Sequence, residues 1–127
     1  MVAKDLMSAH GAARAMGWAT LAYSVAVLAR PRVLAAPCGF VDEGQEVAPP
    51  VGMTVRGIAA RDAAMGAAMA LAPAGPALRL ATAARAASDL ADAVIFGAGL
   101  APQGRAAKVS GVAAAWGALN LACLARM

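Results

Sequence analysis

The chain has few charged residues and few aromatic residues. Charged residues make up 14% of the 127 residues and aromatic residues 4%, whereas an ordinary soluble domain contains about 25% charged residues. A soluble helical bundle of this length would also fill its core with leucine, isoleucine and phenylalanine. An alanine-rich soluble bundle is the alternative, but the composition favours helices that pack closely in lipid, where small side chains promote helix association.

Motifs for the common cofactors are absent from the sequence. The two cysteines, Cys38 and Cys123, form neither a CxxC pair nor a zinc-binding spacing. No glycine-rich phosphate loop, serine elbow or HExxH motif occurs. The net charge is +4, but the basic residues are scattered singly, unlike the basic stripe of a nucleic-acid-binding protein. We therefore expect no cofactor, no metal and no nucleic-acid partner.

Hydrophobic residues, by contrast, are abundant. They make up 61% of the chain, and the mean hydropathy is +0.66. Four apolar segments are separated by turns that contain proline and glycine, or by a polar loop at 37–50. These segments cover about 9–29, 54–72, 77–100 and 107–125.

The length of each apolar segment approaches the roughly 20 residues that a helix needs to cross a bilayer. The sequence therefore predicts a single all-α domain over 1–127, a four-helix transmembrane bundle with antiparallel up-down connectivity. We expect a multi-pass protein of the cell membrane with the lipid bilayer as its partner. Whether it forms a homo-oligomer is left open.

Basic residues are distributed unequally between the two ends of the predicted bundle. One end has four of them next to helix ends: Arg30, Arg32, Arg105 and Lys108. The other end has three: Lys4, Arg79 and Arg126. Because cytoplasmic loops carry an excess of lysine and arginine, the first end is predicted to be cytoplasmic, with both termini outside.

The third predicted helix carries a polar stripe. Steps of three and four residues place five polar side chains on one face: Thr82, Arg85, Ser88, Asp89 and Asp92. In a membrane such a face must turn toward a partner or a wet cavity, because a lone charge at the bilayer centre costs at least about 2.5–3.5 kcal/mol.

The second predicted helix supplies a partner for this stripe. If the two helices are antiparallel, Arg61 and Asp62 lie about as deep in the bundle as Asp92. We therefore expect Arg61 to pair with Asp92 or Asp89. Four basic residues are expected near the opposite surface instead: His10, Arg14, Arg79 and Arg85.

Polar and aromatic side chains of the outer helices are expected at the same depth. Tyr23 and Ser24 on the first helix and Trp116 on the fourth fall near this level, with Asn120 about one turn deeper. These four residues are the candidate substrate-binding residues.

Three functions are compatible with the charged residues. As an enzyme, the protein would open an epoxide or start a cyclisation in a lipophilic biosynthetic substrate: one carboxyl group protonates the leaving oxygen and another orients water or an internal hydroxyl. The candidate catalytic residues are Asp62, Asp89, Asp92 and Arg61. This Asp–Arg–Asp combination is similar to that of limonene-type epoxide hydrolases, an analogy between sites alone. In a non-catalytic membrane subunit or scaffold, the same ion pairs only hold the helices. Third, the aspartates would relay protons or cations through an oligomeric transporter.

A family resemblance rests on the segment 55–66, VRGIAARDAAMG, and on ASDLADA at 87–93 after a Pro/Gly turn. An Arg-Asp pair near a glycine, with an aspartate on the next helix, resembles a family of small four-helix membrane proteins from bacteria and fungi without an established function. The resemblance covers most of the chain from residue 51 onward. It implies a membrane location and four helices, but no activity. The residues that it highlights are Arg61, Asp62, Gly66, Asp89 and Asp92.

Small residues within the predicted helices would let the backbones approach closely. We expect this packing role for Gly57, Gly66, Ala70, Gly97, Gly99, Gly111, Ala115 and Gly117.

Overall fold

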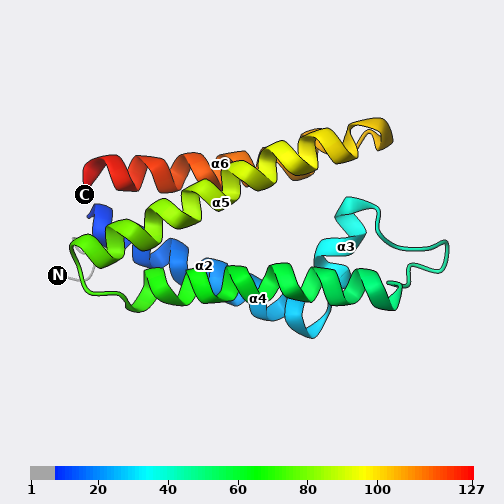
Figure 1. The fold of residues 1–127 in the computed structure, drawn as a ribbon, viewed down its shortest axis with the longest axis horizontal. Coiled ribbons are helices and arrows are strands. Elements are labelled where there is room, and N and C mark those ends of the chain that lie inside the picture. The colour runs from blue at the N-terminus through cyan, green and yellow to red at the C-terminus, as the bar shows by residue number, and fades with distance from the viewer. Residues whose placement is uncertain (1–7) are drawn as a thin grey trace.

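The computed structural model describes residues 8–127, which form an all-α fold (Figure 1). No strand occurs in this range, so the predicted all-α class is confirmed. Lys4, counted above among the basic residues, lies outside the described residues. The elements are five α-helices and one 3-10 turn: α2 (Ala9–Ala29), α3 (Arg32–Cys38), α4 (Pro49–Leu71), α5 (Pro76–Leu100), η1 (Ala101–Gln103) and α6 (Ala106–Arg126).

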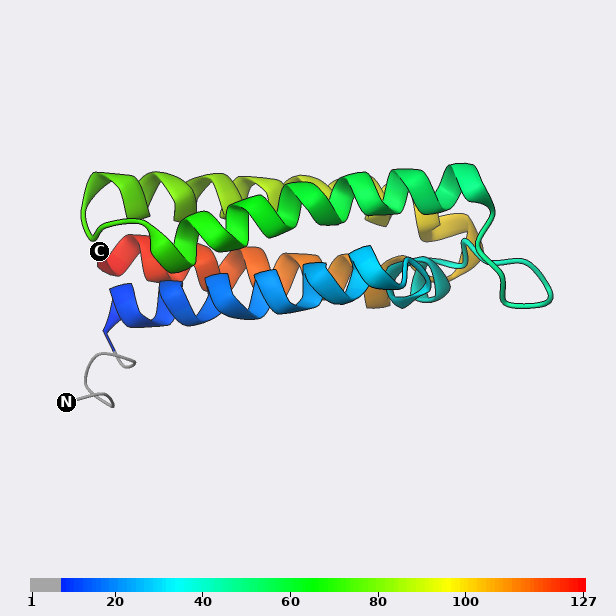
Figure 2. The same cartoon turned by 90° about the horizontal axis from the view of Figure 1, so that it is seen from below.

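The four long helices lie alongside one another in an antiparallel, up-down order (Figures 1 and 2). Helix α2 packs along α4 and α5 packs along α6, whereas contacts between α4 and α5 and between α2 and α6 are much sparser. The bundle therefore consists of two closely packed helix pairs, α2/α4 and α5/α6. We call the end with the C-terminus and the start of α2 the terminal end, and the end with α3 and η1 the loop end (Figure 2).

Local signals in the sequence explain where the long helices begin and end. The Oγ of Ser8 accepts a hydrogen bond from the N–H of Gly11 at 2.9 Å and caps α2. Gly75, with a φ of 110°, and Gly104, with a φ of 69°, turn the chain before α5 and after η1. Glycine adopts these positive φ values without steric cost. Helix α5 then starts at Pro76, because proline fits the first turn of a helix.

The connection between α2 and α4 differs from the polar loop expected over 37–50. Helix α3, which the sequence analysis did not predict, lies mostly before this loop and overlaps only its first two residues, and Gly39, with a φ of 76°, ends the helix. Helix α4 begins at Pro49 instead of residue 54. The N–H groups in the first turn of a helix have no partner within the helix, so the two prolines at the start of α4 cost it no hydrogen bond. They therefore belong to the helix and not to the loop. The other long helices begin and end within one residue of their predicted bounds.

Apolar cores at both ends of the bundle enclose a polar middle layer. At the loop end, buried side chains of Val27, Ala35, Val55 and Ala59 pack together. At the terminal end, Ala13, Met69 and Leu78 do so. The buried polar and charged side chains come from the stretches between these two cores: Thr20, Ser24, Thr82, Arg85, Asp89 and Asn120.

Two glycines allow α2 and α4 to touch. A Cβ atom at Gly17 would lie 2.7 Å from the backbone nitrogen of Ala70, and one at Gly66 would lie 2.8 Å from the carbonyl oxygen of Gly17. Only glycine fits such distances, so the packing role predicted for Gly66 is confirmed, and Gly17 joins it as a residue that the sequence analysis missed. The prediction was wrong for three glycines whose added Cβ would meet nothing within 4 Å: Gly57, Gly99 and Gly111.

Two helices, α2 and α6, are long and apolar enough to cross a membrane by length and composition. Helices α4 and α5 are longer, at 23 and 25 residues, but each carries several charged residues. The described residues therefore contain two candidate membrane spans, and the predicted four-helix transmembrane bundle is not confirmed.

Candidate functional site

Five charged side chains meet halfway along the bundle, between α4 and α5. Helix α4 supplies Arg61 and Asp62, and α5 supplies Arg85, Asp89 and Asp92. Both helices are oriented by the Pro/Gly turn at the terminal end, which places the middle of α4 beside the middle of α5 (Figure 2). We call these five residues the Arg/Asp cluster.

The outer half of the Arg/Asp cluster is a guanidinium group held between two carboxylates. The Nε of Arg61 donates to Oδ1 of Asp62 at 2.9 Å, and its Nη2 donates to Oδ2 of Asp92 at 2.8 Å. The side chain of Arg61 is 39% exposed, while both carboxylates are half-buried. The predicted pairing of Arg61 with Asp92 is therefore present, and it is accessible from outside the bundle.

The inner half of the cluster is buried. Arg85 donates from Nε to Oδ2 of Asp89 at 3.0 Å and from Nη2 to Oδ1 of Asp89, one turn along the same helix. Its Nη1 lies 2.9 Å from Oδ1 of Asp62, an ion pair whose angle lies outside hydrogen-bond geometry. The side chains of Arg85 and Asp89 are only 8% and 3% exposed. Asp62 therefore contacts both arginines and connects the two halves.

The predicted position of Arg85 was wrong. The sequence analysis placed it near the opposite surface with His10 and Arg14, whereas it lies in the buried half of the cluster. Arg85 lies within the middle third of α5, and its long side chain runs along the helix toward Asp89. The polar stripe contained the signal, because Arg85 and Asp89 are four residues apart on one helix face. Arg14, in contrast, lies toward the terminal end, where its Nη1 donates to the carbonyl of Ala70 at 3.0 Å.

The four candidate substrate-binding residues lie on α2 and α6 and differ in burial and in hydrogen-bond partners. Asn120 reaches the cluster: its Nδ2 donates to Oδ2 of Asp89 at 3.4 Å and to the carbonyl of Trp116 at 3.1 Å. The Nε1 of Trp116 donates to Oγ1 of Thr20 at 3.0 Å, which links α6 to α2. Ser24 is buried, whereas Tyr23 is half-exposed and lies within electrostatic range of Asp62. Thr20 was missed by the sequence analysis, although it lies one helical turn before Ser24.

Several buried oxygens in the polar layer have no hydrogen-bond partner among residues 8–127. They are Oγ of Ser24, Oγ of Ser88 and Oδ1 of Asn120. Each can accept a hydrogen bond from water or from a polar ligand group, since buried polar atoms are stabilised by such partners. Within the described range, no group of three or more His, Cys, Asp or Glu residues is placed to hold a metal ion.

Two clefts of the described part lie away from the Arg/Asp cluster. One, of about 650 Å³, lies at the loop end beside Arg30 and Arg56. The other, of about 530 Å³, lies between α4 and α5 toward the terminal end and is lined by alanine and leucine. Neither cleft includes a residue of the cluster.

Comparison with known proteins gives no relative: no family model, no curated protein and no solved structure matches the chain. The resemblance to a family of small four-helix membrane proteins therefore stays a prediction.

Proposed function

We propose that the chain is a multi-pass membrane protein whose four long helices, α2, α4, α5 and α6, all cross the bilayer. They contain 21, 23, 25 and 21 residues. At a rise of about 1.5 Å per residue they are about 32 to 38 Å long, against a hydrocarbon core of about 30 Å. The lengths therefore suit four crossings, with the start of α2 and the C-terminus on one side.

The outer surface of the bundle supports this proposal. Large hydrophobic side chains are exposed on all four long helices: Trp18, Tyr23, Val25, Met53, Leu71, Leu80, Val94, Ile95, Val112, Leu119 and Leu121. In water such a surface promotes association, whereas lipid solvates it. The charges that make α4 and α5 less apolar largely pair with one another, as charges within membrane helices do.

The geometry of the Arg/Asp cluster best supports a structural role. Its cross-helix ion pairs, Arg61 with Asp92 at 2.8 Å and Arg85 with Asp62 at 2.9 Å, connect α4 to α5. They lie where the pairs α2/α4 and α5/α6 make few other contacts. Buried ion pairs specify how elements pack even where they add little stability. We therefore infer a non-catalytic membrane subunit or scaffold whose ion pairs hold two helix pairs in register.

One observation favours a second function, acid–base catalysis on a lipophilic small molecule. Asp62 and Asp92 share the exposed guanidinium group of Arg61. In epoxide hydrolysis, one carboxyl group would give its proton to the epoxide oxygen while the other carboxylate takes a proton from the attacking water. The carbon–oxygen bond of the ring breaks, a diol forms, and a proton transfer between the two carboxyl groups restores the site. The transport hypothesis stays a prediction without an observation in its favour.

Membrane extraction tests the location. We expect the full chain, expressed in its host, to stay in the membrane pellet through alkaline carbonate and to leave it only with detergent. Release by carbonate would contradict the four crossings and would restore the alanine-rich soluble bundle.

Single substitutions separate the two roles of the cluster. In a host that needs the protein, the scaffold role predicts that Asp92→Asn retains function as long as the variant stays folded in detergent, because an amide oxygen still accepts from Arg61. The catalytic role predicts loss of function without loss of folding. Asp42→Asn, in the exposed loop, is the matched control. A folded but inactive Asp92→Asn protein would refute the scaffold, and a folded and fully active one would refute the enzyme.

A further inference from the structure

The loop end contains a cationic cleft that the Arg/Asp cluster does not use. It has a volume of about 650 Å³ and lies where α2 ends and α4 begins. A cleft of this size falls within the range that holds small molecules, about 300–1,000 Å³. Its charged lining residues are three arginines and one carboxylate: Arg30, Arg32, Arg56 and Glu46. The lining therefore has a net charge of +2.

The arginines of the cleft have donors to spare. Arg56 donates from Nε to the carbonyl of Leu28 at 3.0 Å, which anchors the side chain, and its two terminal amino groups have no hydrogen-bond or ion-pair partner in the described part of the chain. Arg30 and Arg32 are exposed and make no ion pair with any residue in 8–127. An exposed arginine without a partner binds phosphate oxygens well, because its planar donors match their geometry.

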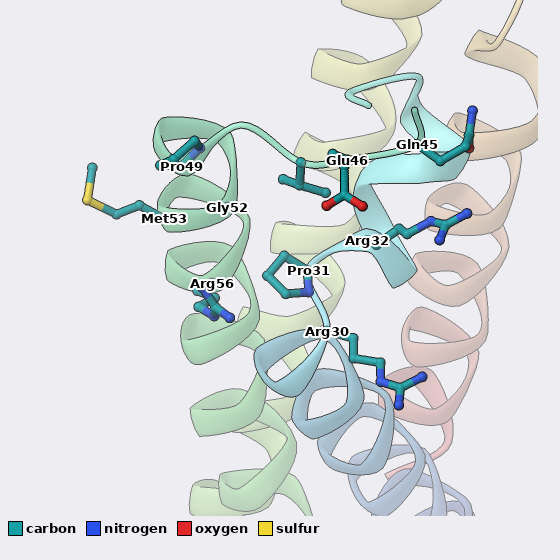
Figure 3. A pocket seen from close by; sticks show the side chains of 10 residues that line it. Arg30, Pro31, Arg32, Gln45, Glu46, Pro49, Gly52, Met53 and Arg56 are labelled. Carbon is teal, nitrogen blue, oxygen red and sulfur yellow. The ribbon is translucent and has the colours of Figure 1, made fainter. Parts of the chain in front are cut away.

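The cleft is lined by charged residues and by apolar residues (Figure 3). Arg56 lies on the α4 side of Pro31, while Arg30 and Arg32 lie on its other side, and Glu46 stands above it. The guanidinium groups of Arg30 and Arg32 extend away from α4, whereas that of Arg56 lies beside it, so the three groups do not meet at a point (Figure 3). This arrangement suits a head group larger than a single ion. The apolar side of the cleft is formed by Val47, Pro49 and the exposed Met53.

We propose that this cleft binds the phosphate-bearing head group of an anionic phospholipid at the membrane surface. Arg30 and Arg32, which lie on one side of the cleft, would contact the phosphate. Glu46 and Gln45 would accept hydrogen bonds from hydroxyl groups of the head group, and Met53 would lie beside the first carbons of the acyl chains. The inference rests on the proposed membrane crossing, because only then does the end of α2 lie at head-group depth. Inorganic phosphate has the same chemistry and is the other source of this group.

Lipid retention by the full chain tests the proposal. The protein is purified in an uncharged maltoside detergent with equal amounts of phosphatidylglycerol and phosphatidylcholine, and the lipids bound to it are counted by native mass spectrometry. We expect the wild-type protein to retain phosphatidylglycerol over phosphatidylcholine by about tenfold or more, since each basic residue near a membrane surface contributes about one kcal/mol toward anionic lipid. The double variant Arg30→Gln plus Arg32→Gln should lose this preference.

A matched control separates the cleft from general charge attraction. Arg79→Gln plus Arg126→Gln removes the same charge from exposed arginines at the terminal end and should leave the preference unchanged. Equal loss in both double variants, or no loss in the first, would overturn the proposal. Helix content by circular dichroism checks the fold, and the single variants Arg30→Gln and Arg32→Gln serve if the double variant unfolds.

Two further outcomes distinguish the source of the phosphate and the location of the protein. If inorganic phosphate at millimolar concentration displaces the bound phosphatidylglycerol, the cleft is a free-phosphate site and the lipid proposal is overturned. If the protein is soluble without detergent, the membrane crossing fails and the lipid proposal fails with it. If the protein needs detergent but shows no lipid preference, only the cleft proposal fails.

Discussion

Asp89 and Asp92 lie three residues apart on α5 and each accepts from an arginine, yet replacing them by alanine should have very different costs. Asp89 is 3% exposed and its partner Arg85 8% exposed, so Asp89→Ala leaves a buried guanidinium group with Asp62 alone. Removing one partner of a buried ion pair costs about 3–5 kcal/mol. Asp92→Ala leaves Arg61, which is 39% exposed and keeps Asp62. Losing such an exposed pair costs about 0.2–1 kcal/mol.

The comparison is well matched, because both variants lose the same side chain from the same helix and gain the same helix propensity. We therefore expect the free energy of unfolding to differ between them by roughly 2–4 kcal/mol. The assay is an SDS titration in mixed micelles, in which circular dichroism monitors the loss of helix. Adding Arg85→Met to Asp89→Ala should recover stability, since it removes the unpaired charge. Equal costs of the two alanine variants, or no recovery by Arg85→Met, would refute the division into a buried inner and an exposed outer half.

Three further predictions concern packing, location and thiol chemistry. Gly66→Ala should destabilise the fold by about 1–3 kcal/mol, because the added Cβ would lie 2.8 Å from the backbone of Gly17. Gly57→Ala is the control on the same helix: its Cβ would meet nothing within 4 Å, so it should be neutral or stabilising in the same SDS titration. Leu119 is 52% exposed on α6, and Leu119→Asp should block membrane insertion in a glycosylation-mapping assay, since a mid-bilayer aspartate costs about 2.5–3.5 kcal/mol. Insertion of this variant would contradict the exposure of Leu119 to lipid. Burial raises the pKa of the Cys38 thiol more than the guanidinium group of Arg105 lowers it. Because only the thiolate is nucleophilic, alkylation of Cys38 measured by mass spectrometry should be slow at neutral pH and faster as the pH rises. Fast labelling at pH 7 would contradict the burial of Cys38.

The sequence was sufficient for the four long helices, but not for α3. Their ends depend on residues close by in the chain, such as Gly75 before α5 and Gly104 after η1, whose backbone angles are a local property. The pairing of Arg61 with Asp92 could be predicted for a similar reason. When a short turn joins two helices, the constant rise per residue gives the depth of each side chain in the bundle from its position in the sequence. The start of α4 could not, since two prolines mark the end of a loop and the start of a helix equally well.

Only the tertiary structure decided which helices are close partners. Chain order suggests α4 with α5, but α4 packs most extensively on α2, because Gly17 and Gly66 happen to face each other and let the two backbones touch. That choice leaves α4 and α5 joined mainly through charges, and it brings Arg85 into the centre beside Asp62. A count of residues along one helix gives the depth of a side chain but not its neighbours. Which charges are buried and which are exposed, and hence what the cluster can do, follows from how the helices pack.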